Sequence, residues 1–303
     1  MQPLVHPGPQ TQPRIIARSV TTRRAVCPLA PDRPLIDQLH ETLAALGADS
    51  GFAEIHRGDY SPLSYCVPAG ATAEKALSFS ATRDHDVAHL LYGSVTLGVR
   101  EDVPYMHSHC FWQTTDGTLQ GGHIWLETEA GADAPFAVVT GVYGARWRSA
   151  TDPETLMPVF TPEEARIDMQ DLDTTGEDAV IARVLPNLDI TEAVLRVCRD
   201  AGFETASVRA GLGSFVGATF IDRATGERRL VDGPATEVIA LVGDVRTVDD
   251  ELETRLTATL VDRHGVIHAG ELVAGENLVA ATFELTIQRI DTPVADLDPS
   301  HAT

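Results

Sequence analysis

The segment HSHCFWQTTDGTLQGGH, residues 107–123, constrains the fold more than any other part of the chain. Its central TTDGT predicts a three-residue hairpin loop, in which Gly117 takes the left-handed conformation that glycine reaches at low cost. Counting back from this loop along both strands pairs His109 with His123. The sequence therefore fixes the register of two antiparallel strands and predicts a sheet around them.

The same register brings three histidines together. His107 and His109 are two positions apart, so their side chains lie on one face of a strand. Directly opposed residues such as His109 and His123 share a face, with Cβ atoms about 5 Å apart. Cys110 points to the other face, so no fourth protein ligand is at hand. Three histidines with an open position are typical of a catalytic or ligand-binding transition metal; alternatively, they are strand histidines hydrogen-bonded within a polar face.

Two further side chains share the histidine face. Glu127 follows His123 by four residues, and Tyr105 lies opposite it on the other strand. Either is a candidate general acid or base beside the metal. The alternative for Glu127 is an exposed carboxylate at the end of a strand.

Arginines near two apolar strand segments are candidates for binding a carboxylate of the substrate. They are Arg83 in SATRDHD, and Arg146 and Arg148 in GARWRSATDPET. A guanidinium holds a carboxylate through two parallel hydrogen bonds. Alternatively, these arginines form ion pairs that fix a loop.

Length and charge set the limits around this site. A chain of 303 residues favours two domains over one. The 44 acidic and 23 basic residues give a formal charge of -21, which repels nucleic-acid backbones and anionic membranes. We therefore expect neither partner. No targeting segment and no run of about 18 apolar residues is evident, so we expect a cytoplasmic protein.

Helix and hairpin patterns occur twice. DRPLIDQLHETLAALGADSGFAEI and NLDITEAVLRVCRDAGFETASV each predict an amphipathic helix, with Asp32 and Asp189 as the N-caps. A second hairpin, LTATLVDRHGVIHAGELVAG, follows the first at an offset of 148 residues, but Arg255, Thr257 and Glu271 stand where the three histidines would be. Metal binding is therefore expected in the first copy alone.

Strand-like segments fill most of the remaining chain. We expect an α+β fold of two tandem domains, each an antiparallel β-sheet with a flanking helix. The expected boundaries are a metal-binding domain at 14–160, an acidic linker at 161–179, a domain without metal ligands at 180–290, and flexible tails at 1–13 and 291–303.

The segments MHSHCFWQTTDGTLQGGHIW, VLPNLDITEAVLRVCRDAGFETASVRAGLGSF and LTATLVDRHGVIHAGELVAGENLVAATFEL resemble the plants-and-prokaryotes conserved (PPC) domain, in two copies of which the second is degenerate. The resemblance implies a compact antiparallel sheet with packed helices, trimeric association and a metal ion, zinc, on His107, His109 and His123. Plant members bind DNA through an added AT-hook, whereas this chain has no RGRP hook, so DNA binding is a minor option.

From these observations we expect a zinc-dependent hydrolase or lyase that acts on a small polar or carboxylated metabolite and forms a homo-oligomer, most simply a trimer. The alternative is a non-catalytic regulator that binds a ligand or metal. A turnover screen with small carboxylates separates the two functions.

Overall fold

The computed structural model describes residues 1–71, 76–165 and 178–290. In this part of the chain there are two helices, α1 (Leu35–Leu46) and α2 (Ile190–Ala201). The strands of the first half are β1 (Ile15–Pro28), β2 (Gly51–Tyr60), β3 (Leu63–Cys66), β4 (Arg83–His85), β5 (Ala88–Arg100), β6 (Val103–Thr114), β7 (Leu119–Ile124), β8 (Phe136–Tyr143), β9 (Ala145–Thr151) and β10 (Pro158–Glu164). Those of the second half are β11 (Ala179–Val184), β12 (Thr205–Phe215), β13 (Ala218–Ile221), β14 (Arg228–Val231), β15 (Thr236–Val248), β16 (Glu251–Val261), β17 (Ile267–Leu272) and β18 (Val279–Arg289).

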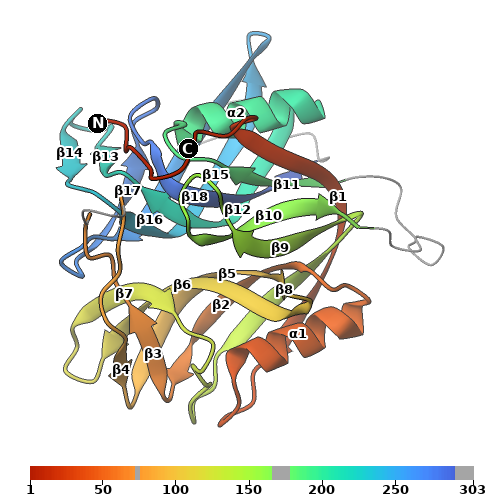
Figure 1. The fold of residues 1–303 in the computed structure, drawn as a ribbon, viewed down its shortest axis with the longest axis vertical. Helices are drawn as coiled ribbons and strands as arrows, with labels where there is room; N and C mark the ends of the chain where they lie inside the picture. The colour runs from red at the N-terminus through yellow and green to blue at the C-terminus, as the bar shows by residue number, and fades with distance from the viewer. Residues whose placement is uncertain (72–75, 166–177, 291–303) are drawn as a thin grey trace, which may run out of the picture.

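The strands form two sheets that lie one above the other along the long axis of the molecule (Figure 1). The lower sheet runs in the order β1-β8-β2-β5-β6-β7-β3-β4, with β9 and β10 at the end of β5. The upper sheet runs in the order β1-β11-β18-β12-β15-β16-β17-β13-β14. Apart from a short parallel contact between β5 and β9, the pairings are antiparallel.

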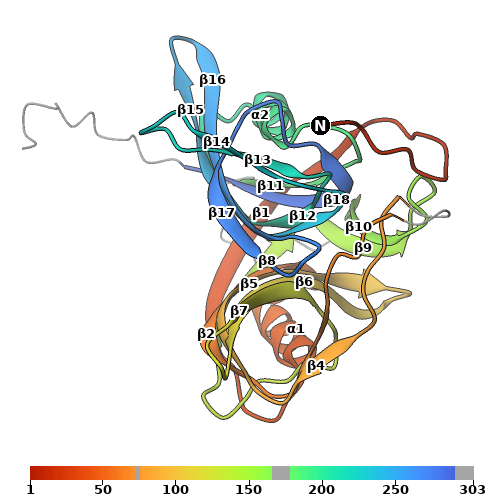
Figure 2. The same cartoon turned by 90° about the vertical axis from the view of Figure 1, so that its left-hand side faces the viewer.

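Strand β1 belongs to both sheets. Its first part pairs with β11, from Ile15 opposite Val184 to Val20 opposite Ala179. Its second part pairs with β8 from Thr21 onward. Figure 2 shows this strand passing from the upper to the lower sheet. The two halves of the chain are therefore joined by a continuous strand as well as by packing.

The expected α+β class is wrong. The described chain is mostly antiparallel β-sheet, with two helices of 12 residues each. The helices have conspicuous amphipathic patterns, which gave them too much weight in the sequence. Three strands are as long as either helix or longer, namely β1, β5 and β15 with 13 or 14 residues. The sheets, and not helix packing, determine this architecture.

The two helices begin in different ways. Asp189 caps α2 as predicted, because its carboxylate accepts hydrogen bonds from the backbone of Thr191 and Glu192. The predicted cap at Asp32 is wrong. Helix α1 begins after Pro34, which is extended and pairs with Glu129 in an isolated bridge, so the fixed φ of proline sets the start.

An apolar seam connects the two sheets. Trp147 and Phe160 from β9 and β10 are each 1% exposed, and they pack with Val20, Val142 and Ile181. These residues come from both halves of the chain. Each large side chain buried in this way contributes about 1.5–3 kcal/mol to the free energy of folding, so the seam stabilises one arrangement of the two sheets.

The expected domain boundaries remain a prediction, and several fall at informative places. Residues 1–13 lie against both halves, because Leu4 donates to Asn187 Oδ1 at 2.8 Å and Gly8 donates to the Glu154 carbonyl at 2.9 Å. Most of the expected linker, 166–177, and the tail 291–303 lie outside the described residues.

Within the described residues, neither helix has the length and apolar character needed to cross a membrane.

Candidate metal centre between the two halves

The hairpin of β6 and β7 has the register that its turn predicts. The backbone N–H of Thr114 donates to the Thr118 carbonyl at 2.9 Å, and Gly117 has a φ of 88°. His109 lies directly opposite His123. The expected hairpin and its shared histidine face are therefore confirmed.

This face of the hairpin points at the second half of the chain. His107 Nδ1 donates to the carboxylate of Glu284 on β18, at 2.9 Å to Oε1 and 3.0 Å to Oε2. His109 Nδ1 donates to the backbone carbonyl of Val238 on β15 at 2.8 Å. Both acceptors lack a hydrogen of their own, so each imidazole carries its proton on Nδ1 and presents the lone pair of Nε2.

The two Nε2 atoms of His107 and His109 are 3.1 Å apart. If both nitrogens present lone pairs, their close approach is unfavourable unless a cation or a proton lies between them. Two nitrogens bound to one zinc at 2.0–2.1 Å lie roughly 3.4 Å apart in a tetrahedron. The ligand atoms of His107, His109 and His123 all lie within 4.8 Å of one another. These residues therefore fit a metal ion.

Burial keeps the imidazoles neutral, which is the form that binds metals. The pKa of His123 is lowered to about 3, first by burial and then by the neighbouring His107. The pKa of His109 is lowered well below its ordinary value, again mainly by burial, and His109 is 1% exposed.

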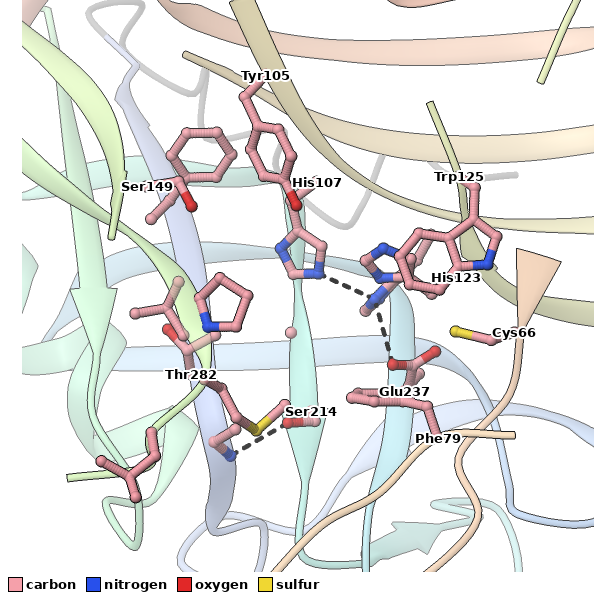
Figure 3. A pocket seen from close by; sticks show the side chains of 18 residues that line it. Cys66, Phe79, Tyr105, His107, His123, Trp125, Ser149, Ser214, Glu237 and Thr282 are labelled. Carbon is pink, nitrogen blue, oxygen red and sulfur yellow. Dashed lines mark hydrogen bonds and ion pairs between the residues drawn. The ribbon is translucent and has the colours of Figure 1, made fainter. Parts of the chain in front are cut away.

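A carboxylate from the second half completes the polar end of the site. Glu237 on β15 is 2% exposed, and its Oε1 lies 3.6 Å from His109 Nε2. Its Oε2 is buried without a hydrogen-bond partner among the described residues. Burial raises the pKa of Glu237 to about 8. Figure 3 shows this carboxylate facing the histidines.

The histidines and Glu237 line a cavity of about 280 Å³ between the two halves. Tyr105 and Trp125 of the first half line it, and so does the buried thiol of Cys66. Ser214 and Thr282 close it from the second half. The cavity is thus a joint product of both halves of the chain.

The other candidate site residues lie elsewhere. Glu127 is exposed and lies beyond the end of β7, so the strand alternation that placed it on the histidine face does not reach it. Arg83 is exposed and lines a separate cavity. Arg148 donates to Asp102 at 2.8 Å, and both Arg146 and Arg148 lie near Glu163 on β10. Of the candidates, the structure brings together Tyr105 and the three histidines.

Sequence reasoning missed the residues that the second half supplies. Glu284 is 177 positions from His107, so local spacing carries no information about this contact. A signal was nonetheless present, because Glu237 and Glu284 stand inside the apolar strands ATEVIALVG and ATFELTIQ. An acid inside an apolar strand is rarely buried unless it is paired or functional.

Comparison with known proteins places a family in the second half. Residues 173–291 match the Plants and Prokaryotes Conserved (PCC) domain. A PPC domain is present there. The match covers the half that lacks the three histidines, so the assignment of residues 14–160 to a tandem copy stays a prediction. A search of curated proteins found no match.

Solved structures of similar shape include three with informative descriptions. A PPC protein from Pyrococcus horikoshii is 20% identical, with 40% of this chain and 86% of that chain covered and a TM-score of 0.33. A metal-containing protein from Archaeoglobus fulgidus is 16% identical, with 47% and 94% covered and a TM-score of 0.35. A "Putative DNA-binding protein" from Ralstonia eutropha is 14% identical, with 47% and 94% covered and a TM-score of 0.36.

The last comparison conflicts with the expectation of no nucleic-acid partner, which we withdraw. Net charge is a sum over the whole surface and does not exclude a local basic region. Such a region exists here, because Arg23, Arg24, Arg209 and Arg289 line one groove where β1, β12 and β18 meet. The expected trimer is tested neither by the single chain nor by these comparisons.

Proposed function

We propose that the chain is a metal-dependent enzyme that acts on a small molecule in the cavity between its two halves. The observation that carries this proposal is the pair of imidazoles whose Nδ1 atoms donate to Glu284 and Val238, so that their Nε2 lone pairs converge at 3.1 Å. A bound transition metal, zinc in this proposal, would supply Lewis-acid polarisation of a carbonyl or activation of water, which suits hydrolase or lyase chemistry.

The residues of the chain divide the remaining work. Glu284 fixes the tautomer and the orientation of His107, as carboxylates commonly do behind a ligating histidine. Glu237 is the proposed proton acceptor or donor, in place of Glu127, because its carboxylate faces the histidines from the opposite wall. Tyr105 remains a candidate because it lines the cavity with them.

The proposal is tested in two steps. The purified protein is stripped with a chelator, reloaded with zinc at neutral pH, and assayed for bound metal by elemental analysis; we expect about one ion per chain. The loaded protein is then screened for turnover of small carboxylic acids and esters. Glu237→Gln is expected to retain metal but lose turnover, whereas Glu127→Gln is expected to retain both. Failure to retain zinc refutes the proposal. Ligand-induced stabilisation without product would instead identify a non-catalytic binding protein.

A second candidate function, DNA binding, is favoured by the arginine groove and not by the cavity. Arg24 and Arg289 come from different strands, and Arg289 stacks on Phe203 with its guanidinium 4.6 Å from the ring centre. Phosphate groups bind such clusters in a salt-dependent manner. In a mobility-shift assay at physiological salt, the double variant Arg24→Ala/Arg289→Ala should weaken any complex. A wild-type protein that shifts no duplex excludes this function.

A further inference from the structure

The cavity has two chemically different ends. The polar end consists of the three histidines, Glu237 and the thiol of Cys66. The rest of the wall is mainly apolar and includes Phe79, Met157, Val159 and Phe160. A ligand that satisfies both ends has one polar group and an apolar body.

The charge on the wall excludes one broad class of ligand. Among the described residues that line the cavity, none is lysine or arginine, and one, Glu237, is acidic. A dianion such as a phosphate ester or a dicarboxylate would therefore meet a buried acid with only a bound metal to balance its charge. The cavity is suited to a ligand that is neutral or carries a single charge.

One neutral hydrogen-bonding group in the wall lacks a partner. Ser149 on β9 is 4% exposed, lines the cavity, and has an Oγ without a hydrogen-bond partner among the described residues. Figure 3 shows it on the same side of the cavity as Tyr105. A buried hydroxyl of this kind costs free energy until a ligand or water binds it, so it marks a second polar contact for the ligand.

The volume limits the size of the apolar body. A cavity of about 150 Å³ lined by aliphatic and aromatic side chains is large enough to bind benzene. The cavity here is about 280 Å³. It therefore accommodates a single ring with a short substituent, and two fused or linked rings would exceed it.

We propose that the ligand is a single-ring aromatic compound, neutral or singly charged, with one oxygen-donor group directed at the histidines and its ring against Phe79 and Phe160. The direction of the donor group rests on the proposed function, because it assumes a metal at the histidines. The ring site itself rests on the apolar wall alone. This narrows the expected polar or carboxylated metabolite to one that is polar at one end.

Two hydroxamates test this proposal, because they share a metal-binding group and differ in the ring. Benzohydroxamate and acetohydroxamate are titrated calorimetrically into the zinc-loaded and the metal-free protein, with malonate as a small dianion. We expect benzohydroxamate to bind at least about tenfold more tightly than acetohydroxamate, because the ring buries apolar surface. Malonate should be the weakest of the three.

A matched pair of variants locates the ring. Phe79 is 37% exposed and lies near His123, with ring centres 6.3 Å apart. Phe136 is 38% exposed and stacks on His56, away from the cavity. Phe79→Ala should weaken benzohydroxamate binding by roughly three- to tenfold and leave acetohydroxamate unchanged. Phe136→Ala should change neither.

The outcomes separate this inference from the proposed function. Equal affinities for the two hydroxamates, tighter binding of malonate, or equal effects of the two phenylalanine variants overturn the ring site, even if zinc binds as proposed. A protein that binds no zinc but prefers the ring in its metal-free form refutes the metal-dependent function and supports the ring site.

Discussion

The two hairpins of the molecule have the same register and opposite surroundings. In β6–β7, His109 lies opposite His123, and in β16–β17, Thr257 lies opposite Glu271 at the corresponding positions. His109 is buried against the second half, whereas Thr257 is exposed and Glu271 binds Arg223, whose Nε donates at 2.6 Å.

The difference shows that the hairpin geometry does not make the metal centre by itself. The first hairpin faces β15 and β18, which supply Val238, Glu237 and Glu284 to the histidines. The corresponding face of the second hairpin has an arginine–glutamate ion pair, which is screened by solvent and contributes about 0–1 kcal/mol to stability. A buried face with acceptors behind it is the condition for chemistry at this position.

The largest expected difference between the hairpins is in metal content. His109→Ala should reduce bound zinc from about one ion per chain to none, because two remaining imidazoles hold a divalent ion weakly. The matched change in the second hairpin, Thr257→Ala, should leave metal content unchanged. Elemental analysis after gel filtration measures both. Retention of zinc by His109→Ala would contradict the assignment of this residue as a ligand.

The next effect concerns the acceptors behind the hairpins. Glu284→Gln removes the charged acceptor of His107 Nδ1 and should weaken zinc binding by about 10- to 100-fold, as measured by chelator competition. Glu271→Gln removes a carboxylate from the second hairpin and should have no effect on zinc affinity. Equal affinities of the two variants would show that Glu284 only packs against the ring.

Acid should destabilise the metal-free protein through the first hairpin. The folded-state pKa of His123 is about 3, below the ordinary value of 6.5, so the unfolded chain binds the additional proton between these values. The stability contributed by neutral His123 is present above pH 6.5 and falls as the pH drops toward 3. In urea titrations between pH 7 and pH 5, His123→Asn should lose about 1 kcal/mol less stability than the wild type. Parallel pH profiles would contradict this origin.

The smallest expected effect is common to both hairpins. Gly117 and Gly265 have φ values of 88° and 81° in the two turns. Alanine at either position should cost about 1 kcal/mol of stability, because a Cβ disfavours the left-handed conformation. Thermal unfolding of the two variants measures the costs. Costs that differ by more than about 1 kcal/mol would show that one turn has constraints beyond its backbone conformation.

The sequence predicts what is local in this molecule. The turn around Gly117 determines the pairing of His109 with His123, and Asp189 caps its helix because both features depend on neighbouring residues. Asp32 was a wrong prediction because the bridge at Pro34, which involves a distant residue, sets the helix start. Local spacing also left out Glu284.

The remaining site residues depend on how two sheets pack. Glu237 reaches the histidines from β15, and the seam around Trp147 determines how the halves meet. The arrangement of whole sheets is not encoded in residue spacing. Glu127 was placed by extending a strand that ends at Ile124.

The central claim, one metal held by three histidines at the face between the halves, is tested most directly by X-ray absorption spectroscopy of the zinc-loaded protein. We predict three imidazole nitrogens at about 2.0–2.1 Å, with the outer-shell scattering that imidazole rings give, and loss of one imidazole in His123→Ala. A sulfur ligand at about 2.3 Å, which would place Cys66 on the metal, or a shell of oxygen atoms without imidazole would contradict the claim.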